Sequence, residues 1–132
     1  KPGKQQALFS MIDVYASFAT LLNHALPTGV APDSRDQLNN FLGTDTIGCD
    51  YVVQQNLNNT LSIIQNNWKY IEPSDKPALE HWTKMETGNN PQPQLYDLSV
   101  DPSEKENLAG NHPDKVKELA ILLEKVKAAK TK

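Results

Sequence analysis

The sequence predicts an α+β fold, in which two N-terminal helices precede a four-stranded antiparallel sheet that carries a C-terminal helix on one face. Short runs rich in β-branched and aromatic residues recur after residue 50, and Asn-rich turns separate the first three of them. Connections this short favour hairpins over parallel crossovers. Apolar residues at helical spacing occupy both ends of the chain, which predicts the helices.

The first predicted helix opens at Ser10, which forms with Asp13 an S-x-x-D pattern close to a capping box. An apolar stripe with spacings of three and four follows, at Ile12, Tyr15, Phe18, Leu22 and Ala25. Further apolar residues lie off this stripe, at Met11, Val14 and Leu21. We expect a helix that is apolar over so much of its circumference to be buried on more than one side. Pro27 is expected to end it, because the residue before a proline avoids the α region.

A second, short helix is predicted over residues 35–42. Ser34 and Gln37 repeat the capping pattern at its start, and Gly43 suits the position just past its end. Its apolar side chains face one way, at Leu38, Phe41 and Leu42.

Four strands are predicted, over residues 51–55, 60–65, 68–72 and 94–98. The first two connections turn at Asn58-Asn59 and at Asn66-Asn67, since Asn tolerates left-handed backbone angles. Residues 73–93 form a long polar loop with several prolines between the third and fourth strands. Loops of this length are uncommon and are often functional or mobile.

The last helix is predicted to begin near Pro113, a residue that suits the first helical position. Asp114 complements the positive end of its dipole. Its buried stripe is predicted at Val116, Leu119, Leu123 and Val126.

The composition excludes several function classes. The net charge of -3 and the pI of about 5.5 argue against nucleic acid as a partner, because phosphate binding requires a basic face. No apolar run approaches the roughly 20 residues that span a bilayer. Residues 1–6 lack the apolar core of a signal peptide, so either a signal has been removed or the chain is an internal segment.

The sequence contains no self-sufficient catalytic or metal-binding constellation, and we predict neither catalytic residues nor metal ligands in it. No P-loop, GxGxxG, HExxH, GxSxG or EF-hand pattern is present. The histidines lie far apart and outside metal-ligand spacing, at His24, His81 and His112. No basic residue flanks Cys49, and Asp50 opposes thiolate formation, which predicts a buried, inert cysteine.

Several segments, taken in order, resemble the type I sulfatases, the arylsulfatase family, of bacterial type. The stretch QLYDLSVDPSEKENLA at residues 94–109 is similar to the LYDL-x-x-DP-x-E-x-x-NLA signature near the C-terminus of these enzymes. Similar matches are found for SMIDVYASFATLL, APDSRDQLNNFLG, TLSIIQNNWKYI and the helix that begins HPDKVKEL. The departures, such as Ala16-Ser17 where the family often has Pro-Thr, concern the subfamily and touch no catalytic motif.

The resemblance implies that this chain is the C-terminal part of an enzyme that hydrolyses sulfate esters. Residues 1–46 would be the helical end of its large α/β domain, and residues 47–132 its C-terminal subdomain. The family makes a formylglycine in a C/S-x-P-x-R motif and holds Ca²⁺, both in the N-terminal domain. Cys49 is followed by Asp50-Tyr51-Val52 and does not match that motif, so this chain alone is expected to be inactive.

The implied partners are the N-terminal domain and a sulfated carbohydrate or aryl sulfate, in a periplasmic or secreted protein. One side of the first helix would then be bare, as an exposed apolar patch or a surface for self-association. The candidate rim of the substrate cleft is Gln54, Gln55 and Asn56, whose amides can bond sugar hydroxyls. Three alternatives stay open: a plain polar strand end, a free-standing carbohydrate- or protein-binding module, and a purely structural subdomain.

Overall fold

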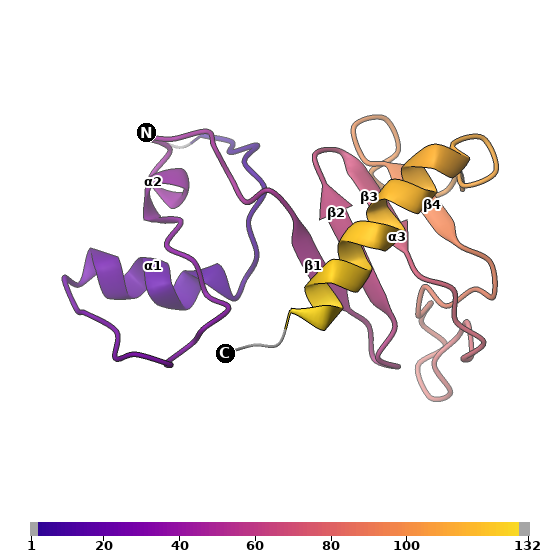
Figure 1. Cartoon of the computed structure of the whole chain (residues 1–132), viewed down its shortest axis with the longest axis horizontal. Helices are drawn as coiled ribbons and strands as arrows, with labels where there is room; N and C mark the ends of the chain where they lie inside the picture. The colour runs from indigo at the N-terminus through magenta and orange to yellow at the C-terminus, as the bar shows by residue number, and fades with distance from the viewer. Residues whose placement is uncertain (1–2, 130–132) are drawn as a thin grey trace. The chain divides into compact units, whose positions relative to one another are not determined.

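The computed structural model describes residues 3–129 (Figure 1). Along the chain the elements are α1 (Asp13–Leu21), α2 (Leu38–Phe41), β1 (Val52–Gln55), β2 (Leu61–Gln65), β3 (Trp68–Ile71), β4 (Gln94–Asp97) and α3 (Pro113–Ala128). They confirm the predicted α+β fold. Val53–Ala129 form one compact unit, and the described residues up to Val52 form another.

The four strands form a meander in the order β1-β2-β3-β4. The pairs β2/β3 and β3/β4 are antiparallel, with Gln65 opposite Trp68 and Trp68 opposite Asp97. Gln65 and Trp68 leave a two-residue turn at Asn66-Asn67, where Asn66 takes a positive φ of 54°. That angle is what the favoured two-residue hairpin turns require at their first central position. The turn between β2 and β3 therefore lies at Asn66-Asn67, where the sequence predicts it.

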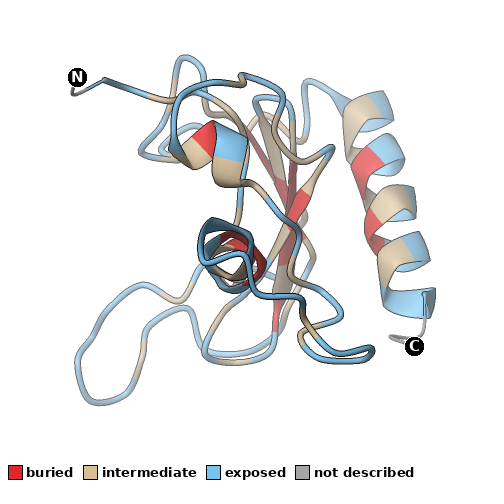
Figure 2. Ribbon diagram, turned by 90° about the vertical axis from the view of Figure 1, so that its left-hand side faces the viewer, coloured by how far each residue is buried: buried red, intermediate tan, exposed pale blue. Residues whose placement is uncertain are grey.

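Helix α3 covers one face of the sheet, and the core of this unit lies between them (Figures 1 and 2). Cross-strand pairing places Ile63, Tyr70 and Leu95 in one row across β2, β3 and β4. Two leucines of α3 complete this core, Leu119 at 0% and Leu123 at 1% exposure. Burying a side chain of this size contributes about 1.5–3 kcal/mol, so this contact holds the helix on the sheet. Pro113 is the first residue of α3, as predicted.

Helix α1 is shorter than the sequence predicts, because Asn23 ends it before Pro27. Asn23 has a φ of 53°, and the His24 N–H donates to the Ala19 carbonyl at 2.8 Å, as in a Schellman motif. At the start of α1, the Ser10 N–H donates to Asp13 Oδ2 at 2.9 Å, which is half of the expected capping box.

The face that α1 buries consists of three small or polar residues, Asp13, Ala16 and Ser17. The predicted stripe is instead largely exposed, with Leu22 at 76%, and Met11, which lies off the stripe, is 79% exposed. Met11, Ile12, Tyr15, Phe18 and Leu22 line a shallow apolar surface, which we call the α1 patch. The exposed apolar patch expected beside this helix is therefore present.

Helix α2 spans only Leu38–Phe41, in place of the predicted 35–42. The groups expected to cap it bond to α1 instead. Ser34 Oγ accepts the Ala16 N–H at 2.9 Å, and the Gln37 N–H donates to Ser17 Oγ at 2.8 Å. Gly43 occupies the position past the helix end with a φ of 72°, as predicted. Among residues 3–129, no helix is long and apolar enough to cross a membrane.

Candidate functional site

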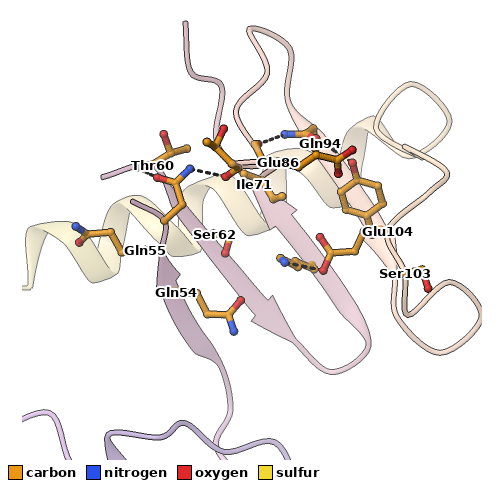
Figure 3. Close-up of a pocket in the computed structure, with 14 residues that line it drawn as sticks. Gln54, Gln55, Thr60, Ser62, Ile71, Glu86, Gln94, Ser103 and Glu104 are labelled. Carbon is orange, nitrogen blue, oxygen red and sulfur yellow. Dashed lines mark hydrogen bonds and ion pairs between the residues drawn. The ribbon is translucent and has the colours of Figure 1, made fainter. Parts of the chain in front are cut away.

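The face of the sheet that α3 leaves free carries a cavity of about 650 Å³ with polar walls (Figure 3). Successive side chains of a strand point to opposite faces, so the residues next to the Ile63–Tyr70–Leu95 row point into this cavity. They are Ser62 on β2, Lys69 and Ile71 on β3, and Gln94 and Tyr96 on β4. Two loops complete the wall, with Glu86, Thr87 and Gly88 on one and Ser103 and Glu104 on the other.

The three residues singled out by sequence, Gln54, Gln55 and Asn56, all line this cavity. Gln54 and Gln55 are exposed, and Gln55 Nε2 donates to Asn59 Oδ1 at 2.6 Å. Figure 3 shows the Gln54 side chain projecting from the strand, with no hydrogen bond drawn to its amide. Both amides are therefore placed where a ligand in the cavity can reach them.

Asn56 has a different role, because its amide is already bonded within the protein. Its Nδ2 donates to the Thr87 carbonyl and to Asn89 Oδ1, both at 2.8 Å. Its Oδ1 accepts the N–H groups of Asn58 and Thr60, each at 2.9 Å. With two donors and two acceptor positions used, this amide fixes the loop that walls the cavity.

The floor of the cavity is formed by two buried side chains that bond to each other. The Tyr96 hydroxyl donates to Gln94 Oε1 at 2.9 Å, and Gln94 Nε2 donates to the Gly88 carbonyl at 2.7 Å. Burial raises the pKa of Tyr96, since the phenolate would lose its hydration, so the hydroxyl keeps its proton. These bonds tie the floor to the loop at Gly88 and give the cavity a fixed shape.

The ionisable lining gives the cavity a net negative charge. Lys69 Nζ and Glu104 Oε1 form an ion pair at 2.7 Å, and Glu86 is a second lining carboxylate. Glu104 adopts a positive φ of 54°, which is uncommon for a residue other than glycine. Two carboxylates against one ammonium disfavour a second anion and suit hydroxyl and amide groups.

Sequence patterns identified only three of these lining residues, Gln54, Gln55 and Asn56. Lys69 and Glu104 are 35 positions apart, and nothing in their local sequence indicates that they pair. The one signal available is alternation along the third and fourth strands, which places Lys69 and Tyr96 opposite the apolar face. Loop residues such as Glu86 carry no such signal.

The described residues do not offer a site for a metal such as Ca²⁺. Within residues 3–129, no three side chains of His, Cys, Asp or Glu gather in a position to hold an ion. The Cys49 thiol donates to Asp13 Oδ2 at 3.5 Å and accepts from Gln37 Nε2 at 3.5 Å. Cys49 is half-buried, so the prediction that it is buried is wrong. Its partial burial still raises the pKa of Cys49, and the Asp13 carboxylate raises it further, which keeps the thiol protonated and supports its interpretation as inert.

No protein-family model matches the chain. In sequence it is similar to the N-acetylgalactosamine-6-O-sulfatase of Bacteroides thetaiotaomicron, with 63% identity over 127 residues that cover 96% of this chain and 25% of that relative. It is also 26% identical over 130 residues to arylsulfatase K of Xenopus laevis, covering 89% of this chain and 22% of that protein. The chain thus spans about a quarter of the length of these curated relatives, at 25% and 22%.

A solved structure agrees with the sequence comparison. The chain is similar to a Bacteroides thetaiotaomicron structure described in connection with the metabolism of multiple glycosaminoglycans. The two share 62% identity and superpose with a TM-score of 0.89, over 97% of this chain and 27% of the other. This likeness extends over both compact units of the chain.

Proposed function

Since this chain belongs to the sulfatase family and corresponds to the C-terminal region of its relatives, we propose that the whole protein hydrolyses sulfate esters. The observation that carries the proposal is the 63% identity to an N-acetylgalactosamine-6-O-sulfatase over 96% of this chain. The substrate class we propose is a carbohydrate that contains 6-sulfated N-acetylgalactosamine.

The family resemblance implies a formylglycine and Ca²⁺, and we place both in the N-terminal domain of the whole protein, where the family holds them. We assign no catalytic role to any residue of this chain. Its proposed location is periplasmic or secreted, like that of the family it resembles.

The role we propose for this chain is to form part of the rim of the substrate cleft and to hold that rim in place. Gln54 and Gln55 would form part of the rim, where their amides can bond sugar hydroxyls, and Asn56 would hold that rim in place. Residues 1–46 would belong to the large domain of the whole protein. The α1 patch supports this assignment, because an apolar surface of this kind fits a protein–protein contact, here with the N-terminal domain.

The test is to assay the whole protein and this chain in parallel with N-acetylgalactosamine 6-sulfate and with nitrophenyl sulfate. We expect the whole protein to release sulfate from the sugar, and we expect no release of sulfate or nitrophenol by the chain alone. Turnover by the isolated chain would show that chemistry resides in these residues. A whole protein that hydrolyses neither compound would refute the proposal.

The rim is tested by replacing Gln54 and Gln55 together with alanine in the whole protein. We expect KM for the sulfated sugar to rise about ten-fold with little change in kcat, because two exposed hydrogen bonds of about 0.5–1.5 kcal/mol each are lost from binding. Gln65, which lies on β2 outside the cavity lining, is the matched control. Unchanged KM and kcat in the double variant would favour the alternative that this strand end is only structural.

A further inference from the structure

Ser62, on β2, is a buried polar residue whose side chain bonds to no other described residue. It is only 8% exposed, and Figure 3 draws no hydrogen bond to its hydroxyl. The other buried Ser, Thr, Asn and Gln side chains of the same compact unit all bond to protein groups, at Thr60, Asn89 and Gln94. Because buried polar groups are nearly always hydrogen-bonded, a buried hydroxyl without a protein partner marks a position for an atom of a ligand.

The Ser62 hydroxyl is accessible from the polar cavity. Ile63, the next residue of β2, belongs to the row that faces α3, so Ser62 points to the opposite face and lines the cavity. Within residues 3–129, Asn40 Oδ1 is the one side-chain N or O atom that is sealed off and without a partner. The unbonded Ser62 oxygen is therefore not sealed in the protein, and a ligand in the cavity can reach it.

The strand register places Ser62 between an amide and an apolar side chain. On one side Ile71 of β3 lies directly opposite Ser62. On the other side the Asn56 N–H donates to the Thr60 carbonyl at 3.0 Å, and the same antiparallel pairing, continued by two residues, sets Gln54 opposite Ser62. Opposed side chains on one face are about 4.5–5.5 Å apart at Cβ. Gln54, Ser62 and Ile71 therefore form one row across the cavity floor, and all three line the cavity.

Building on the proposed function, on which this inference rests, we propose that this row binds the 2-acetamido group of N-acetylgalactosamine 6-sulfate and that Ser62 determines the specificity for it. An acetamido group requires an acceptor for its N–H, a donor for its carbonyl oxygen and an apolar surface for its methyl group. The Ser62 hydroxyl accepts the N–H, Gln54 Nε2 donates to the carbonyl, and Ile71 packs on the methyl.

The order of these three residues matches the geometry of the acetamido group. A planar trans amide has its N–H and its methyl on one side and its carbonyl oxygen on the other. Across the sheet Ser62 and Ile71 are neighbours, and Gln54 lies on the far side of Ser62. One acetamido group can therefore contact all three side chains at once.

The charge of the cavity agrees with this orientation of the sugar. Glu86 and Glu104 against Lys69 leave the lining net negative, which disfavours the sulfate group. In the pyranose ring C2 lies across from C5, the atom that carries C6, so an acetamido group in the cavity directs the 6-sulfate away from it. The sulfate then lies outside the cavity, where the N-terminal domain of the whole protein can receive it.

The test compares kcat/KM of the whole protein for N-acetylgalactosamine 6-sulfate with that for galactose 6-sulfate, which has a hydroxyl in place of the acetamido group. The readout is the ratio of the two values, in which a loss of folded protein cancels. We expect the wild type to favour the acetamido sugar, and Ser62→Ala to lower the ratio about five-fold, as the loss of one neutral hydrogen bond predicts. If galactose 6-sulfate is hydrolysed too slowly to measure, its inhibition constant replaces its kcat/KM.

Two further variants separate the hydroxyl from other effects. Ser62→Thr keeps the hydroxyl and should retain most of the ratio. Ser99→Ala removes an exposed hydroxyl outside the cavity lining and should leave the ratio unchanged. An equal fall of the ratio in Ser62→Thr and Ser62→Ala would assign the effect to the shape of the cavity and overturn the role of the hydroxyl.

The remaining outcomes distinguish this inference from the proposed function. A wild type that hydrolyses both sugars equally well, or an unchanged ratio in Ser62→Ala, overturns the acetamido site and leaves the sulfatase function intact. A lower thermal midpoint of Ser62→Ala with an unchanged ratio shows that Ser62 is only structural, which also overturns the site. A wild type that hydrolyses neither sugar refutes the proposed function and the acetamido site with it.

Discussion

Replacing Asn89 with alanine is expected to lower the free energy of unfolding of the Val53–Ala129 unit by about 3 kcal/mol. Asn89 is only 6% exposed, and its amide makes four bonds. Oδ1 accepts from Asn56 Nδ2 at 2.8 Å and from the Thr60 hydroxyl at 2.7 Å. Nδ2 donates to Asn58 Oδ1 and to the Pro77 carbonyl, both at 3.0 Å. Alanine removes all four bonds at once, but Asn56 Nδ2, the Thr60 hydroxyl and the Pro77 carbonyl each keep one other partner. The expected loss is therefore well below four times the cost of about 1–3 kcal/mol for an orphaned buried group.

Urea unfolding followed by tryptophan fluorescence measures this effect, because Trp68 and Trp82 are both in this unit. Asn90→Ala is the matched control, since Asn90 is exposed and its side chain accepts one local bond, from the Gln92 N–H at 2.8 Å. We expect the control to change stability by less than about 1 kcal/mol. Equal effects of the two substitutions on the free energy of unfolding would show that the Asn89 hydrogen bonds do not stabilise the loop.

The same bonds show why the sheet was predictable and the cavity was not. The strands follow from local patterns: apolar and polar residues alternate, and Asn59 and Asn66 turn with positive φ where the sequence places turns. The observed strands lie within one residue of the predicted ends. The cavity instead depends on bonds such as Asn56 to Asn89, which join residues 33 positions apart. Such a pairing leaves no trace in local composition.

The helices of the first unit show a second limit of sequence patterns. The apolar stripe of α1 predicts burial, whereas the buried face consists of Asp13, Ala16 and Ser17. Periodicity identifies an amphipathic helix and does not say which surface covers its apolar side. Here Ser34 and Gln37 bond to α1 instead of capping α2, so tertiary bonds override the local capping signal.

The three candidate rim residues show both what the local sequence predicts and what only the long-range hydrogen bonds decide. Sequence placed Gln54, Gln55 and Asn56 together at a polar strand end, and the structure places all of them along one cavity. Their different situations, two exposed amides and one amide fully bonded, depend on Thr87 and Asn89 in a distant loop. Residue type alone therefore indicates the neighbourhood of a site, and the hydrogen bonds decide which members are free to act.

Replacing Asp13 with alanine is expected to destabilise the first unit by about 3 kcal/mol. Asp13 is 2% exposed, and its carboxylate accepts the Ser10 N–H at 2.9 Å and the Arg35 N–H at 3.0 Å. These bonds join the start of α1 to the segment before α2. Alanine orphans both N–H groups, whereas Asp13→Asn keeps an acceptor oxygen and should cost less. Hydrogen exchange of the amides from Ser10 to Arg35 measures the difference.

The pKa of Cys49 offers a second, independent way to measure the effect of the Asp13 carboxylate. Burial is the larger cause that raises the pKa of Cys49, and Asp13 adds to it by its charge and by the bond at 3.5 Å. Removing the charge in Asp13→Asn should therefore lower the pKa of Cys49, so that more thiolate is present at any given alkaline pH. The rate of alkylation by iodoacetamide, measured against pH, should shift to lower pH in this variant. Superimposable rate profiles would mean that Asp13 does not influence the thiol, and the stability loss would then belong to the two N–H bonds alone.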